Sequence, residues 1–185
     1  PAQHLAEDTP DPFHQHIKRW LILGPIPVFE GEPDKADAVK IQEAVRADLL
    51  VEAGGEANVR PEADDTVVVR GQEFTWQAAE SDDDVFDLAD PLGNGECVIA
   101  YAWAELDAEE AQDVVLGVGT DDEASVWVNG ELVHENQARR PAKVDDDAVP
   151  ASLLAGSNAI LLKVHNFDGD WGFACRVMDA AALGG

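Results

Sequence analysis

The sequence has little positive charge. Only 12 lysines and arginines stand against 38 aspartates and glutamates, so the formal net charge is −26 at pH 7. A surface of that sign repels nucleic-acid phosphates and anionic lipid headgroups, which excludes nucleic acid as a partner. The sequence also has no apolar run as long as a membrane span. We therefore expect no insertion into a bilayer.

Cysteine is scarce as well, and the familiar catalytic motifs are missing. Cys97 and Cys175 are the only two cysteines, and without a C-x-x-C spacing they indicate neither a zinc site nor a thioredoxin-like motif. They form either one disulfide or two buried thiols, and we favour the thiols. No G-x-S-x-G, H-E-x-x-H, Walker or Rossmann pattern occurs. We therefore predict no catalytic residues and no enzyme.

Acidic residues are present throughout the chain, in runs at 82–84, 121–123 and 145–147. Such a surface is typical of adaptation to high salt, because the Debye length falls to roughly 3 Å at 1 M and screens the self-repulsion. The composition therefore indicates a halophilic source. A cation site at Asp82–Asp84 is the rival interpretation of the first run.

The chain of 185 residues is long enough for one domain with its own hydrophobic core. Residues 1–16 show no periodicity and are predicted to form a tail or linker, and 180–185 a C-terminal tail. The first segment contains His4, His14 and His16, which either bind a metal or are scattered polar residues. Because the sequence begins at Pro1, we expect a processed or trimmed chain.

One helix is predicted in an otherwise extended chain. Apolar residues recur at spacings of three and four within 35–51, and Gly54-Gly55 follows as a stop. Before it, Ile17–Leu23 is predicted to be a strand that leads into a rigid turn at Gly24–Pro27.

Short strands separated by turn residues dominate from Thr66 onward. The candidates are 66–69, 74–78, 97–105, 113–118, 124–128, 131–134, 159–166 and 172–178. This order predicts an all-β sandwich over residues 17–179, with 17–95 as a lead-in half that carries the short helix and 96–179 as the core. Asn129-Gly130, between two apolar strands, predicts a type I′ hairpin.

Alternation along the strands places both cysteines on apolar faces. Cys97 shares its face with Tyr101 and Trp103, and Cys175 shares its face with Phe173.

Several segments of the second half occur together in a familiar order: Ala100-Tyr101-Ala102, 117–122, 126–130, 156–164 and 170–173. In this order they resemble galactose-binding-like jelly-roll domains, including the sugar-binding domain of family 2 glycoside hydrolases. The resemblance covers roughly 96–179. It implies a jelly-roll β-sandwich and a sugar ligand, although many members of the superfamily are structural spacers and a fold does not fix a function.

The loop 165–171 carries the best candidate binding residues. Trp171 would be the aromatic platform for a sugar ring, and the polar candidates around it are His165, Asn166, Asp168 and Asp170. Alternatively, Trp171 caps the edge of the sandwich. Arg139, Arg140 and His134 are secondary candidates, and the two arginines would contact an acidic sugar or pair with the acids at 145–147.

Calcium is the one cofactor that the acidic loops suggest. Asp121, Asp122 and Glu123, or the Asp168–Asp170 turn, offer the oxygen ligands that this ion prefers, and its expected role is structural. Solvated loop acids are the alternative.

Two functions follow from these observations. The first is a non-catalytic carbohydrate-binding accessory domain of a secreted or cell-surface protein, with a polysaccharide or glycan as its ligand. The second is a structural or protein-interaction domain that contacts neighbouring domains of a larger protein. An exposed aromatic at the loop end of the sandwich would favour the first, and a buried Trp171 together with an apolar patch elsewhere would favour the second.

Overall fold

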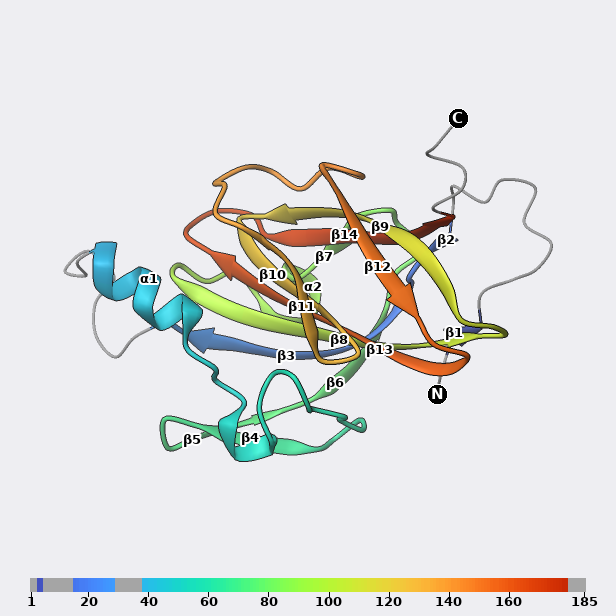
Figure 1. Ribbon diagram of the computed structural model, residues 1–185. Coiled ribbons are helices and arrows are strands. Elements are labelled where there is room, and N and C mark those ends of the chain that lie inside the picture. The colour runs from blue at the N-terminus through green and yellow to red at the C-terminus, as the bar shows by residue number, and fades with distance from the viewer. Residues whose placement is uncertain (1–2, 5–14, 29–37, 180–185) are drawn as a thin grey trace.

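The protein is an all-β sandwich in a computed structural model that describes residues 3–4, 15–28 and 38–179 (Figure 1). Sheet A has the strand order β11-β10-β13-β8-β3-β6, with β1 pairing to β8, and sheet B has the order β12-β9-β14-β2, with β7 pairing to β14. The strands of sheet A are β1 Gln3–His4, β3 Arg19–Pro27, β6 Gln77–Glu80, β8 Val98–Ala108, β10 Glu123–Val128, β11 Glu131–Asn136 and β13 Gly156–Asn166. Those of sheet B are β2 Gln15–His16, β7 Phe86–Asp87, β9 Gln112–Asp121, β12 Asp147–Leu153 and β14 Gly172–Asp179.

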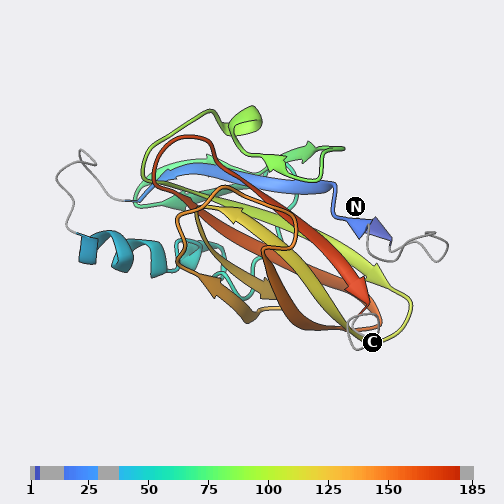
Figure 2. The same ribbon diagram turned by 90° about the horizontal axis from the view of Figure 1, so that it is seen from above.

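The main core lies between the two sheets. Side chains alternate along each strand, so β8 sends Ala100 and Ala102 inward, while β9 and β14 send Leu116 and Phe173 toward them from sheet B. Phe173 lies 5.0 Å from Trp20, ring centroid to centroid, in an edge-to-face contact. Figure 2 shows the strands of this stack from above.

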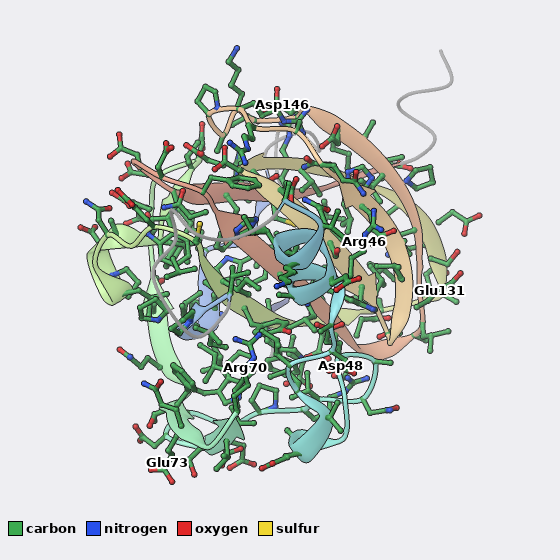
Figure 3. The ribbon with its side chains drawn as sticks, turned by 90° about the vertical axis from the view of Figure 1, so that its left-hand side faces the viewer. Arg46, Asp48, Arg70, Glu73, Glu131 and Asp146 are labelled. Carbon is green, nitrogen blue, oxygen red and sulfur yellow. The ribbon has the colours of Figure 1, made fainter. Side chains whose placement is uncertain are left out.

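A second core covers the outer face of sheet A. Ile99, Tyr101 and Trp103 point outward from β8 and are nevertheless buried, because a third layer packs over them. That layer consists of α1 Ala38–Arg46, the 3-10 turn η3 Val51–Ala53, and a small hairpin of β4 Thr66–Val69 and β5 Gln72–Thr75. Figure 3 shows it from outside, with Arg46 at the end of α1 and Glu73 on the hairpin. The central strand β8 is therefore buried on both faces.

The predicted strands are largely confirmed, with differences at β3, at β5 and β6, and at β12. The short strand β7 and the short helix α2 Ala89–Leu92 were not predicted either. The predicted strand 74–78 is divided between β5 and β6, which diverge at Trp76. The turn expected at Gly24-Pro25 is instead an irregularity within β3, whose pairing with β8 resumes at Ile26. The strand β12 escaped prediction because Pro150 interrupts it; it is an edge strand, where a missing backbone N–H is tolerated.

Of the helix predicted over 35–51, residues Ala38–Arg46 form α1, whereas 47–50 are not helical and Val51 begins the 3-10 turn. Ile41, Ala44 and Val45 pack against the outer core while no residue of the helix is fully buried, so the expected narrow apolar stripe on a surface helix is confirmed.

The hairpin at Asn129-Gly130 is confirmed in its backbone geometry. The φ angles are 50° at Asn129 and 84° at Gly130, the positive values that a type I′ turn requires. The Asn129 side chain also accepts a hydrogen bond from Ala159 N at 2.9 Å, which ties the turn to β13.

The lead-in half and the core half share one sheet. β3 and β6 belong to the lead-in half and continue the sheet that β8, β10 and β13 form. Parts of the expected tail also pair with the sandwich, β1 with β8 and β2 with β14, whereas residues 180–185 lie outside the described residues. No described helix is long and apolar enough to cross a membrane.

Cys97 and Cys175 are both free thiols. Cys175 is buried between the sheets, and Cys97 is half-buried beside the outer core. The two cysteines therefore belong to different layers, as the favoured interpretation requires.

Candidate functional site

Two connections meet at one end of the sandwich. One joins β9 to β10 through Asp121 and Asp122, and the other joins β13 to β14 through residues 167–171. Glu123 pairs with His165 in sheet A, and Asp121 pairs with Gly172 in sheet B. Because each connection is anchored to the other in both sheets, the acidic residues of the two predicted calcium positions lie side by side.

Asp122 joins the two connections directly. Its backbone N–H donates to the His165 carbonyl at 3.1 Å, and its carboxylate Oδ2 accepts from the backbone N–H of Phe167 at 2.9 Å. Its own carbonyl accepts from Thr120 Oγ1 at 2.9 Å, and the Asp121–Asp122 peptide bond is cis. The Asp122 side chain is buried, and hydrogen bonds fix both its backbone and its carboxylate.

Asp121 is half-buried in an environment that opposes its charge. Burial raises the pKa of Asp121 to about 6, and the negative charges of Asp122, Asp170 and Asp168 add to that increase. Asp168 and Asp170 are themselves exposed. Negative charge is therefore concentrated at this end of the molecule without a cation to balance it among these four side chains.

Asn166 supplies an oxygen without a partner at the same place. Its side chain is fully buried, and its Nδ2 donates to the Gly95 carbonyl at 2.8 Å and to that of Gly169 at 3.4 Å. Its Oδ1, in contrast, is buried and accepts no hydrogen bond. Leaving a buried acceptor unsatisfied costs about 1–3 kcal/mol, so this oxygen calls for a donor or a cation.

The donor set suits a hard cation. Carboxylates and an amide oxygen are ligands that calcium prefers, whereas zinc favours nitrogen and sulfur. Among the described residues no group of three His, Cys, Asp or Glu side chains stands ready to hold a metal. A site here would therefore combine the carboxylates with the amide oxygen of Asn166 and with main-chain carbonyls.

Trp171 is not a sugar platform, and that prediction is wrong. Its side chain is only 2% exposed, and it packs in the core between the sheets. Its indole Nε1 donates to the Gly93 carbonyl at 3.2 Å. Local sequence places Trp171 in a loop, but the loop folds back and seals the sandwich, so the alternative of a capping tryptophan is the one observed.

Arg139 lies over the other aromatic ring of this loop. Its guanidinium carbon is 3.3 Å from the centroid of Phe167, a cation–π arrangement. Phe167 in turn contacts His165, with 4.2 Å between ring centroids. Burial, aided by Arg139, lowers the pKa of His165 to about 4. His165 is therefore neutral and buried, and its ring packs against Phe167 of the loop.

Glu123 is separated from its two acidic neighbours. It is buried on β10, where it accepts two hydrogen bonds from Gln42 Nε2 of α1 at 3.0 and 3.2 Å. His165 Nδ1 lies 3.4 Å from Glu123 Oε2. Glu123 therefore fixes α1 to sheet A, and the tripeptide 121–123 does not act as one metal site.

Arg140 and His134 are structural rather than ligand-facing. Arg140 pairs with Asp147 and lies 3.6 Å from Asp146, and His134 Nε2 lies 3.2 Å from Asp147. These contacts hold the 137–147 loop against β11 and β12. The expected pairing with the acids at 145–147 therefore holds for Arg140 and not for Arg139.

The other metal interpretations find no support in the described residues. Lys18 pairs with Asp82 at 2.7 Å, and His16 with Asp84 at 3.3 Å, so the acidic run 82–84 is bound to neighbouring bases. His14 and the side chain of His4 lie outside the described residues.

A buried polar network on the outer face of sheet A was not foreseen. Lys163 Nζ donates to Glu56 Oε1 at 2.8 Å and to the Ala47 carbonyl at 2.7 Å, and Tyr101 Oη donates to Glu56 Oε1 at 2.5 Å. The one signal in the sequence is a lysine inside an apolar strand, Ile160–Val164.

No protein-family model matches this sequence, and no curated protein matches it. Among solved structures, it is similar to a domain described as the PA14 sugar-binding domain from an RTX adhesin, with 13% identity over 91% of this chain and 93% of that chain and a TM-score of 0.44. The PA14 domain of the MpAFP antifreeze protein is 16% identical over 45% of this chain and 44% of that one, with a TM-score of 0.38. A β-glucosidase from Kluyveromyces marxianus is 14% identical over 64% of this chain and 16% of its own, with a TM-score of 0.46. This chain therefore spans less than half of the last two, and its function has to be argued from its own site.

Proposed function

We propose that this domain binds glycans through a calcium ion held at the loop end of the sandwich. The ligands would be the carboxylates of Asp121 and Asp122 and the side-chain oxygen of Asn166, with loop 167–170 closing over them. The two calcium positions considered from the sequence thereby become one site, since both loops lie at the same end.

The observation that carries this proposal is the unpartnered, buried Oδ1 of Asn166, in the residue before Phe167, whose backbone N–H binds the carboxylate of Asp122. A carboxylate cluster alone is common on an acidic surface. A buried amide oxygen without a donor is rare, and a cation at this position satisfies it while balancing the charges of Asp121 and Asp122. Burial and the neighbouring carboxylates raise the pKa of Asp121, and a cation bound there would offset both effects.

A bound calcium ion would supply open coordination positions for the hydroxyl groups of a sugar. The chain's own residues would do the rest. Asp168 and Asp170, exposed on the rim, can accept hydrogen bonds from further hydroxyl groups. Arg139, fixed on Phe167, presents guanidinium donors close to the same loop.

At the level of the whole protein, we propose a non-catalytic accessory domain of a secreted or cell-surface protein from a halophile. The finer assignment to the galactose-binding-like jelly rolls belongs to this proposal as well. Because Trp171 is buried, a sugar ring cannot stack on it. Recognition would therefore depend on calcium and polar contacts.

The test begins with calcium alone. Isothermal titration of the chelator-treated protein should give one site, and the variant Asp121→Asn should weaken it by about tenfold or more, since each lost carboxylate ligand removes a charged contact. The matched control is Asp83→Asn, which removes the same charge from an exposed loop.

A panel of plant, algal and bacterial polysaccharides is then screened with calcium and with a chelator. Retention that requires calcium and is lost in Asp121→Asn would support the proposal. Calcium binding without any retention would leave a structural ion and refute the glycan function. Equal loss in Asp83→Asn would reduce the site to general attraction by an acidic surface.

A further inference from the structure

The strand β6 ends sheet A, and its far edge is open beyond Trp76, whose backbone groups bond to Asp64 and Asp65. It pairs with β3 through Arg19–Ile22, and no other strand of the described chain pairs with its far side. Figure 1 shows it running beside β3 at the margin of the stacked strands. An edge of this kind presents unpaired N–H and C=O groups that can bind another chain.

The register shows which groups face outward. Ser81 N donates to the Lys18 carbonyl at 3.0 Å, so Ser81 directs its backbone groups toward β3. Backbone direction alternates along an antiparallel pair, which directs Ala79 toward β3 too. The N–H and C=O groups of Ala78 and Glu80 therefore face away from the sheet.

A hollow lies beside this edge on the outer face of sheet A. Its volume is about 660 Å³, and Ala78, Leu21 and Trp103 form an apolar row across its floor. Trp103 is 7% exposed, and its buried Nε1 has no hydrogen-bond partner. Three carboxylates, Glu62, Glu80 and Glu105, line this hollow together with one cation, Arg19.

A second hollow lies on the other face of the same strand. Its volume is about 230 Å³, Ala79 and Phe86 line its base, and the acids around it are Glu80, Asp83, Asp87 and Asp90. Small alanines on β6 leave room on both faces, and Glu80 borders both hollows.

The edge strands β11 and β12 carry more features that oppose pairing with another chain than β6 does. Edge strands are usually blunted by proline or by charged side chains. β12 carries Pro150, and β11 carries Glu131 and Glu135. β6 reads Gln-Ala-Ala-Glu, with Glu80 as its one charge.

We propose that the free edge of β6 is a docking site for an extended segment of another polypeptide, in which basic side chains alternate with apolar ones. Such a segment would pair with the outward groups of Ala78 and Glu80 and extend sheet A by one strand. Because its side chains alternate between faces, the apolar ones enter the hollow at Trp103 and the basic ones meet Asp83, Asp87 and Asp90. The site is independent of the calcium site, since it lies on different strands.

The experiment uses a synthetic octapeptide of alternating lysine and valine, titrated into the isotopically labelled domain and followed by NMR. On binding, the amides of Ala78 and Glu80 should become protected from hydrogen exchange. The amide of Ala79 should change little, because it already bonds to β3. A version of the peptide methylated on its bonding amides should not bind.

Variants separate the edge from general charge attraction. Glu80→Lys should weaken the peptide by about tenfold or more, and Glu131→Lys, the same reversal on the opposite edge strand, by less than about twofold. Ala78→Pro removes one outward N–H while leaving the bonds to β3 intact, and it should also reduce binding.

Several outcomes would overturn the proposal. These are no binding of the octapeptide, equal binding of its methylated form, or equal weakening by Glu131→Lys. Protection of Ala78 and Glu80 that depends only on protein concentration would identify a second copy of this chain as the occupant. Chemical shifts confined to Trp103 on adding a polysaccharide would identify a glycan instead.

Discussion

Lys163 is a charged residue in a place that burial should make costly. It is 3% exposed on β13, and desolvation lowers its pKa although Glu56 acts in the opposite direction. Its ammonium group donates to the Glu56 carboxylate and to the Ala47 carbonyl, both in segments that join the elements of the third layer. The pair therefore connects that layer to sheet A, at the price of taking two ions out of water.

Removing one member of this pair should be severe. Lys163→Ala leaves the Glu56 carboxylate buried without its cation, so we expect a loss of about 3–5 kcal/mol in the free energy of unfolding. The double variant Lys163→Met with Glu56→Leu should lose much less, because no charge remains unpaired. Denaturant unfolding measures both, and a Lys163→Ala loss no larger than that of the double variant would contradict the network's role.

The raised pKa of Asp121 predicts how the stability of the protein changes with pH. The pKa of Asp121 is about 6 in the folded protein, against 3.8 for an ordinary exposed aspartate. Between these values the folded state holds the proton more tightly, so this group makes the calcium-free protein less stable as pH rises from about 4 to 6. Asp121→Asn should remove that contribution.

Urea unfolding of wild type and Asp121→Asn across this range checks the sign. The difference between the two proteins cancels His165, whose lowered pKa acts in the opposite direction. Calcium should reverse the difference in favour of wild type, because it stabilises the ionised carboxylate and binds Asp121→Asn more weakly. A difference that stays constant with pH would show that Asp121 is not under electrostatic stress.

Sequence could identify the acids of the site but not their arrangement. Asp121, Asp122, Asp168 and Asp170 are visible as loop carboxylates between strands, and pairing of the strands then brings them together. The burial of Trp171 and the unpaired oxygen of Asn166 depend on how loop 166–171 folds back over residues 93–95. Those contacts join residues more than 70 positions apart, so no local pattern encodes them.

At the scale of elements, two hairpin turns offer a matched comparison. Arg70-Gly71 and Asn129-Gly130 both have positive φ at both residues, yet their surroundings differ. A Cβ at Gly71 would meet nothing within 4 Å, whereas a Cβ at Gly130 would lie 2.4 Å from the Ala57 carbonyl oxygen. Gly130 of the β10–β11 turn is therefore packed closely against the chain at Ala57, whereas the space around Gly71 of the β4–β5 turn is open.

Substitution by alanine should separate strain from packing. Gly71→Ala should cost about 1 kcal/mol, the usual penalty for an L-residue in left-handed conformation. Gly130→Ala should cost about 2 kcal/mol more, because overpacking typically adds about 1–3 kcal/mol. Thermal and denaturant unfolding of the two variants measure the gap. Equal losses would mean that the covering layer yields without cost.

Strand prediction worked where alternation was strong and failed where context decided. β8 and β13 are long and apolar, and the Asn-Gly turn specified the β10–β11 hairpin. β12 has a proline at its centre, so its identity as a strand rests on pairing with β9. β6, with two alanines and two polar residues, becomes a strand because β3 offers it a partner.

For the whole molecule, the charge of −26 dominates any account of stability. Described cations such as Lys18, Arg140 and Arg176 are already paired with carboxylates, which leaves most of the acids to repel one another. The folded state brings these charges closer together than the unfolded chain does, so repulsion works against folding.

Salt should therefore stabilise this protein strongly. Between about 0.1 M and 1 M salt the Debye length falls from about 10 Å to 3 Å, so we expect the melting temperature to rise steeply over that range. A variant with Glu52, Glu73, Glu110 and Glu131 changed to glutamine loses four exposed negative charges. It should be more stable than wild type in low salt and nearly equal to it at 1 M, because screening removes the repulsion that the substitutions relieve.

Melting curves of both proteins are recorded at each salt concentration, with potassium chloride and with an uncharged osmolyte in parallel. The comparison separates screening of charges from the exclusion of solutes from the protein surface. If the gap between the two proteins persisted at high salt, self-repulsion would not be what limits stability, and the argument for a halophilic source would lose its physical basis.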